Sequence, residues 1–305
     1  MHKIINFLPT VLQIVMENSI ELPVRQAAAI YFKNEVVSFW HDKEAKKGQP
    51  QVTYSIHEQD REVIRNAIVD AVVAAPDAIR TSLCVALNYI IKYDFPEKWS
   101  GVVDKIVIYL QTPEPQKWMG ALLALLQLTK NYEYKNNADK GPLLEAMKLI
   151  GPIIYDLMVR LLPDNSEHSA SLQKVILKTI FILTQYSLPL TLFTEEFFSQ
   201  WMQVFRQVLE RPVPAEVSKV EKDERYELSW YKAKKWTLHI LVRVFDRYGL
   251  PKVSHKEYKS FSAWYLKTFS KGVIEIILAM LGQYSAGEYL PPRVVQQCIN
   301  YLNTS

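Results

Sequence analysis

Glycine is scarce in this sequence, with only 9 among 305 residues. Soluble proteins average roughly 7% glycine, and a sheet protein of this size would need glycine for many of its turns. The scarcity therefore favours helices over strands. Proline is better represented, and several prolines stand where amphipathic segments begin, a position that helices tolerate.

Cysteine is almost absent, with only Cys84 and Cys298, and both lie inside apolar helical patterns. The sequence contains neither a CxxC pair nor a Cys/His cluster, which argues against a structural zinc site. Such positions favour two buried free thiols in a reducing compartment. The sequence predicts no metal site and no cofactor.

Short catalytic signatures are missing as well. No G-x-S-x-G, P-loop, G-x-G-x-x-G or H-E-x-x-H motif occurs, and the 6 histidines are scattered. We therefore predict that the protein is not an enzyme. An active site assembled from separated residues is the alternative that sequence alone leaves open.

Long hydrophobic runs are also lacking. The longest uncharged apolar segment, Trp118–Leu128, is well short of the roughly 18 residues that a membrane span needs. No signal peptide opens the chain, because Pro9 and Glu17 interrupt the first apolar run. The net charge of +4 and pI near 8.8 are milder than those of most nucleic-acid binders. We expect a soluble intracellular protein with no membrane and no direct nucleic-acid partner.

What the sequence does contain is a succession of paired amphipathic segments with helical periodicity. The second segment of each pair begins near residues 23, 76, 115, 168 and 227. These spacings are longer and less even than the roughly 40–47 residues of regular HEAT or armadillo repeats. The best fit is an all-α, HEAT-repeat right-handed superhelical solenoid, with the second helix of each pair on the concave side. Neither end resembles a polar cap, so we expect a piece of a longer array.

Two local signals predict helix starts. In "YDFPEKW" (Tyr93–Trp99), Pro96 suits the first position of a helix, Asp94 suits its cap, and Trp99 is expected to pack into the corner. Ser55 and Glu58 have the spacing of a capping box, in which each side chain bonds the other residue's backbone N–H.

One charge pattern stands out in the segment from Trp230 to Gly249. Its cationic or titratable residues are spaced three, four, four and four apart, which places them on one helical face: Lys232, Lys235, His239, Arg243 and Arg247. A solvated face is the simpler interpretation. The alternative is contact with an acidic protein surface, although Glu221, Asp223, Glu224 and Glu227 just upstream could relieve the repulsion.

Two segments, "LPVRQAAAIYFKNEV" (Leu22–Val36) and "IKYDFPEKWSGVVDKI" (Ile91–Ile106), resemble hallmark segments of the importin-β (karyopherin-β) family. "VRLLPDNS" (Val159–Ser166), "ERYELSWYKAKKWTLHILVRVFDRYG" (Glu224–Gly249) and "YLPPRVVQQCINYLN" (Tyr289–Asn303) extend the resemblance over almost the whole chain. These three resemble the importin-seven and importin-eight branch.

The resemblance implies a nuclear import receptor that binds Ran-GTP, protein cargo (basic proteins above all) and nucleoporin FG repeats while shuttling between cytoplasm and nucleus. It further implies that residues 1–110 are Ran-binding HEAT repeats, with the first repeat apparently missing, and that residues 111–305 continue the solenoid. A static HEAT-repeat scaffold without Ran dependence and an exportin of the same family are the alternatives.

The resemblance also suggests where Ran binds. In the family the inner helices of the first repeats meet the GTPase, which here means Pro23–Trp40 and Pro76–Asp94. The polar candidates on these helices are Arg25, Lys33, Asn34, Asn88 and Lys92. With the first repeat missing, we expect weaker Ran binding than an intact N-terminus gives. Ran is also our favoured partner for the basic stripe, with an acidic loop from later repeats as the competitor.

Overall fold

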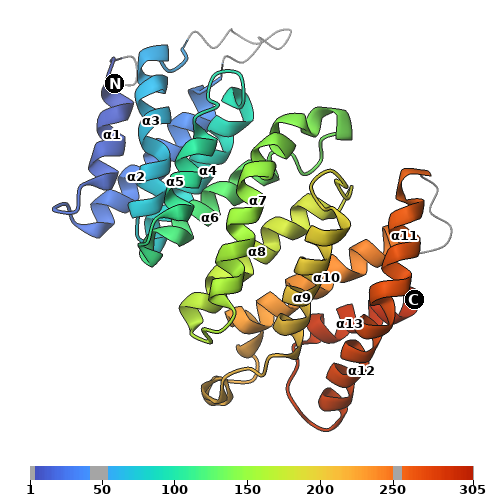
Figure 1. The fold of residues 1–305 in the computed structure, drawn as a ribbon. Helices are drawn as coiled ribbons and strands as arrows, with labels where there is room; N and C mark the ends of the chain where they lie inside the picture. Colours follow the sequence, from blue (N-terminus) through green and yellow to red (C-terminus); the bar gives the residue numbers. More distant parts are fainter. Residues whose placement is uncertain (1–3, 42–53, 250–255, 305) are drawn as a thin grey trace, which may run out of the picture. The chain divides into compact units, whose positions relative to one another are not determined.

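The computed structural model describes residues 4–41, 54–249 and 256–304. These residues contain thirteen α-helices and no β-strand, which confirms the all-α prediction (Figure 1). The chain divides into two compact units, Met1–Ala146 and Met147–Ser305. The predicted boundary at residue 110 concerns function rather than compactness, and it stays a prediction.

The first unit consists of antiparallel helix pairs. Its helices are α1 (Phe7–Met16), α2 (Leu22–Phe39), α3 (Glu58–Ala74), α4 (Asp77–Asp94), α5 (Val102–Gln111) and α6 (Pro115–Lys130). The second helices of the pairs, α2, α4 and α6, pack on one another in succession, and α3 packs on α1 and α5 (Figure 1). Each helix thereby buries an apolar stripe against its own partner and against the neighbouring pair, as in a helical repeat array.

Close approach of helices in the first unit depends on one glycine. A Cβ placed on Gly120 of α6 would overlap the Cα of Val73 and lie 2.9 Å from the carbonyl oxygen of Val72, both in α3. Only a residue without a side chain lets the two backbones come so near.

The corner after α4 differs from the prediction. α4 ends at Asp94 and α5 begins at Val102, so Pro96 does not start a helix. Pro96 instead follows a cis peptide bond in a turn where the N–H groups of Lys98 and Trp99 both donate to the carbonyl oxygen of Asp94. Trp99 is buried, as predicted. The Asp94 side chain caps no helix, because its carboxylate faces inward.

The predicted capping box at Ser55 was also wrong. α3 begins at Glu58, and its N-cap is His57, whose Nδ1 accepts a hydrogen bond from the N–H of Gln59 at 3.3 Å. The Glu58 carboxylate is drawn away to Arg65 and Arg61. Ion pairing along the helix therefore replaces the reciprocal backbone capping that the spacing suggested.

The remaining helices are α7 (Gly141–Leu161), α8 (Glu167–Thr184), α9 (Glu195–Glu210), α10 (Ser229–Val244), α11 (Lys259–Tyr265), α12 (Lys271–Ser285) and α13 (Pro292–Thr304). In the second unit α10 packs between α8 and α13, while α9 contacts α10 and α12 (Figure 1). Two π-helical turns occur in this unit: Phe245–Gly249 follows α10, and Leu266–Ser270 lies between α11 and α12.

Both cysteines are buried free thiols, as predicted. Burial raises the pKa of each thiol to about 11, since desolvation disfavours the thiolate. The thiols of Cys84 and Cys298 therefore stay protonated and behave as small apolar side chains.

Candidate partner-binding surfaces

The ends of α2 and α4 are held together by a buried carboxylate. Asp94, at the end of α4, accepts hydrogen bonds from Nε1 of Trp40 at 3.1 Å and from the guanidinium of Arg65 at 2.8 Å. Trp40 follows α2 directly and Arg65 belongs to α3, so one side chain joins three helices. Sequence reasoning missed this tie because Trp40 and Asp94 are 54 residues apart.

Two of the five predicted Ran candidates are engaged within the first unit. Arg25 is only 7% exposed, and its Nε donates to the carbonyl oxygen of Val15 near the end of α1, at 2.9 Å. Asn88 donates to the carbonyl oxygen of Gln127 at 3.3 Å, and its own carbonyl accepts from Asn131 at 3.0 Å. These bonds fix α1 on α2 and α4 on α6.

The other three candidates remain at the surface. Lys33 is half-buried, while Asn34 and Lys92 are exposed. All three lie in the C-terminal halves of α2 and α4, whose ends the Asp94 tie brings together. The Lys92 ammonium lies 5.1 Å from the centre of the Tyr93 ring, and His41 stacks on the same ring at 4.2 Å. This end of the two helices therefore presents a cationic and aromatic surface.

In the second unit the predicted basic stripe is only partly a continuous row. Lys232 pairs with Glu227, and Arg243 lies 3.8 Å from the Asp246 carboxylate. Arg247 falls beyond the end of α10, where it donates to the carbonyl oxygen of Tyr186 at 2.9 Å. The upstream acids thus neutralise one member of the row, and Arg247 is tied to the segment that follows α8.

The centre of the stripe is a cluster of cations around Trp236. The ammonium of Lys235 lies 4.7 Å from the Trp236 ring centre, and that of Lys178, from α8, lies 5.4 Å from it. Phe181 and His239 flank the same ring at 5.2 and 5.5 Å. Arg293, from the first turn of α13, is exposed and close enough to lower the pKa values of both Lys235 and His239. Neither Lys178 nor Arg293 was foreseen, because they belong to different helices.

The electrostatics of this cluster are unbalanced. The pKa of His239 is lowered to about 4, first by burial and then by Lys235, Arg243 and Arg293, so the imidazole is neutral near pH 7. The pKa of Lys235 is lowered by burial and by Arg293, Lys232 and Lys178, with Glu227 acting in the opposite direction. Within the described residues, neither Lys235 nor Arg293 has a carboxylate within ion-pair distance.

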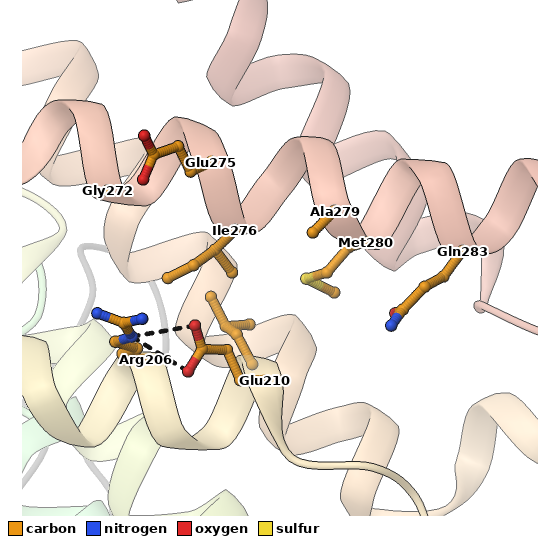
Figure 2. Close-up of a pocket in the computed structure, with 9 residues that line it drawn as sticks. Arg206, Glu210, Gly272, Glu275, Ile276, Ala279, Met280 and Gln283 are labelled. Carbon is orange, nitrogen blue, oxygen red and sulfur yellow. Dashed lines mark hydrogen bonds and ion pairs between the residues drawn. The ribbon is translucent and has the colours of Figure 1, made fainter.

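A third surface is a groove between α9 and α12. Figure 2 shows Arg206 and Glu210 of α9 facing Glu275, Ile276, Ala279, Met280 and Gln283 of α12. The pocket has a volume of about 240 Å³, and a more apolar pocket of about 250 Å³ adjoins it. Arg206 and Glu210 form an ion pair with oxygens at 3.0 and 3.1 Å from Nε. The groove is open at Gly272, where an added Cβ would have no atom within 4 Å.

Lys234 is the most deeply buried cation on α10. Its ammonium donates to the carbonyl oxygens of Leu209 and Arg211, the latter at 2.8 Å. Burial, with Arg211 nearby, lowers its pKa to about 8. Because α9 ends at Glu210, Lys234 supplies hydrogen bonds to carbonyls that the helix itself leaves unpaired.

Two further properties bear on function. Across residues 4–41, 54–249 and 256–304, no three His, Cys, Asp or Glu side chains gather as metal ligands would. In the same residues no helix combines the length and the apolar character of a membrane span.

Comparison with known proteins decides the family. Residues 1–74 match the Importin-beta N-terminal domain. Importin-8 of Mus musculus is 47% identical over 99% of this chain, and Importin-8 of Homo sapiens is likewise 47% identical over 99% of it. This chain belongs to the importin-β family. It spans 30% of the mouse protein and 29% of the human one.

A solved structure confirms the HEAT-repeat solenoid fold of this importin-β chain. The exportin Cse1 in its cargo-free, cytoplasmic state superimposes with a TM-score of 0.76, covering 98% of this chain and 31% of the exportin. The sequence identity is only 15%, so this likeness concerns the fold alone.

Proposed function

We propose that this chain works as the Ran-binding region of a nuclear transport receptor and has no enzymatic role. The observation that carries the proposal is 47% identity to Importin-8 along 99% of the chain. The receptor binds Ran-GTP and protein cargo, passes the pore by contacts with nucleoporin FG repeats, and shuttles between cytoplasm and nucleus. Import is the favoured direction because Importin-8 is the similar relative in sequence, whereas the exportin shares the fold.

We place Ran contact at the surface formed by the C-terminal halves of α2 and α4. The residues that contact Ran there are the three accessible candidates of the five, Lys33, Asn34 and Lys92. Arg25 and Asn88 support the surface from within, through their bonds to Val15, Gln127 and Asn131. The nearby stack of His41 on Tyr93 adds a rigid aromatic edge.

Nucleotide dependence tests the proposal most simply. The chain, immobilised, is exposed to Ran loaded with GTP or with GDP, and the retained Ran is quantified. A transport receptor retains Ran-GTP in clear excess over Ran-GDP. Equal retention of both forms, or retention of neither, would instead support a static scaffold.

Direction of transport needs a second assay. An importin releases its cargo when Ran-GTP binds, whereas an exportin requires Ran-GTP in order to hold its cargo. Cargo captured by the chain within its full receptor and eluted by Ran-GTP supports import. Cargo captured only when Ran-GTP is present would establish the exportin alternative.

A further inference from the structure

The cations around Trp236 lie on helices other than those that carry the proposed Ran site. We define the α10 patch as Lys178 of α8, Lys232, Lys235, His239 and Arg243 of α10, and Arg293 of α13. All six belong to the second unit, and α10 packs directly on both α8 and α13. The patch therefore crosses three neighbouring helices rather than running along one.

The cations of the α10 patch are crowded together in the free chain. Lys235 faces Arg293, Lys232 and Lys178, and these three lower its pKa in concert with burial. Lys232 and Arg243 have carboxylate partners, Glu227 and Asp246, whereas Lys235 and Arg293 have none among the residues that the structure describes. Like charges held together in this way raise the energy of the free protein, and an anionic partner relieves it.

The shape of the patch suits an extended chain. Packed helices lie about 8–10 Å apart, so α8 and α13, which both pack on α10, are at most about 16–20 Å apart. An extended segment of about six residues covers that length. Carboxylates along such a segment can reach the cations of all three helices in turn.

Two kinds of polyanion could meet these cations, and the surroundings of Trp236 distinguish them. Base stacking by a nucleic acid needs an open aromatic face. The ring of Trp236 already has two ammonium groups within 5.4 Å and two aromatic rings within 5.5 Å of its centre. The patch therefore offers charge without a free stacking surface, which favours carboxylates over nucleobases.

We propose that the α10 patch binds an acidic segment of a partner protein. This differs from the sequence-based expectation that Ran meets the basic stripe, because the patch lies on α8, α10 and α13 and the Ran candidates lie on α2 and α4. Binding of the acidic segment should therefore not depend on the nucleotide state of Ran. Lys235 and Arg293 are the principal contacts, since both lack a carboxylate partner among the described residues.

The test measures binding of a fluorescent 12-residue peptide of alternating Glu and Ser by anisotropy, using the full 305-residue chain without Ran. A peptide with Gln in place of Glu is the matched ligand control. We expect the Glu peptide to bind, the Gln peptide to bind at least tenfold more weakly, and the affinity for the Glu peptide to fall between 50 and 200 mM salt.

Charge reversal locates the binding. We expect the double variant Lys235→Glu with Arg293→Glu to bind the Glu peptide at least about tenfold more weakly. Lys259→Glu with Lys267→Glu, two exposed lysines of the same unit outside the patch, should change it less than about twofold. The double variant Lys235→Gln with Arg293→Gln should also weaken binding of the Glu peptide, by a smaller factor. Circular dichroism checks that its fold is unchanged.

Four results would overturn the proposal. One is equal affinity for the Glu and Gln peptides. Another is an unchanged affinity in both patch variants. The third is tighter binding of a single-stranded RNA of equal charge that is lost on the same reversal, which would make the patch a nucleic-acid site. Loss of Ran-GTP binding without loss of peptide binding in the reversal variant would likewise reject the acidic segment.

Discussion

The two units use cationic side chains in opposite ways. In the first unit Arg25 and Arg65 are turned inward, and each finds an acceptor on another helix. In the second unit Lys235 and Arg293 stand near further cations without a carboxylate partner among the described residues. A buried cation with its acceptors joins helices, whereas clustered cations in solvent are available to a partner. Sequence spacing alone does not distinguish the two uses.

Two glycines, one in each unit, also differ in their structural role. Gly120 lies where α6 crosses α3, and a single added carbon would overlap the neighbouring backbone. Gly272 lies at the start of α12, beside the groove, and an added carbon would touch nothing. One glycine is required by packing, while the other weakens its helix without a packing reason.

The largest effect is expected from Asp94→Ala. This change leaves the Arg65 guanidinium and the Trp40 indole N–H without their buried acceptor. Removing one partner of a buried ion pair typically costs about 3–5 kcal/mol of unfolding free energy. Urea denaturation measures the loss, with Glu97→Gln on the exposed part of the same corner as the control. A loss for Asp94→Ala no greater than the control would show that the tie does not hold the helices.

Gly120→Ala should have the next largest effect. The new methyl group collides with the backbone of α3 at Val72 and Val73, so the two helices must move apart. Overpacking of this kind costs about 1–3 kcal/mol. Denaturation by urea again measures it, and an unchanged midpoint would mean that the α3–α6 crossing is looser than described.

The third prediction concerns acid stability and His239. Its pKa is lowered from 6.5 to about 4 in the folded chain, so between these values the unfolded chain binds more protons. The stabilising contribution is therefore complete above pH 6.5 and is lost as the pH falls toward 4. The groups facing the imidazole are Lys235 and Arg243 on α10 and Arg293 on α13, with the Phe181 ring on α8.

The matched variant is His239→Gln, which cannot take up a proton. Thermal unfolding of both chains at several pH values between 4 and 7 should show a shallower loss of stability in the variant. Parallel profiles would mean that His239 titrates normally and that the cations around it exert no net field.

Gly272→Ala should produce the smallest change, and in the opposite direction to Gly120→Ala. The backbone at Gly272 is not in the left-handed region, and the methyl group enters open space. The alanine variant should therefore have a free energy of unfolding about 0.5–1 kcal/mol higher, because alanine has the better helix propensity and makes the unfolded chain less flexible. Denaturation of the two alanine variants side by side checks the sign, and destabilisation by Gly272→Ala would show that the groove is occupied or closed in solution.

Much of the fold was predictable because helix periodicity and apolar faces are local properties. The paired helices, the burial of Cys84 and Cys298 and the packing of Trp99 all follow from patterns within about twenty residues. The errors came from contacts across the sequence. Asp94 looked like a cap because its neighbours suggested a helix start, yet its partners are Trp40 and Arg65.

The candidate surfaces were less predictable for the same reason. Lys235 and His239 could be read from their spacing on one helix. Lys178 and Arg293 belong to helices that only the tertiary packing brings beside α10. Arg247 followed the spacing but lies past the end of α10, bonded to the carbonyl of Tyr186. The spacing predicted a face and could not predict which neighbours share it.

One set of titrations tests the central claim, that surface cations on the two units serve different partners. Ran-GTP and the Glu peptide are each titrated into the unmodified chain, into Lys33→Glu with Lys92→Glu, and into Lys235→Glu with Arg293→Glu, at one salt concentration. We predict that the first variant binds Ran-GTP at least about tenfold more weakly and keeps its affinity for the peptide within about twofold. The second variant should lose affinity for the peptide by at least about tenfold and keep its affinity for Ran-GTP within about twofold. Loss of both ligands in each variant, or of neither in both, would contradict the account.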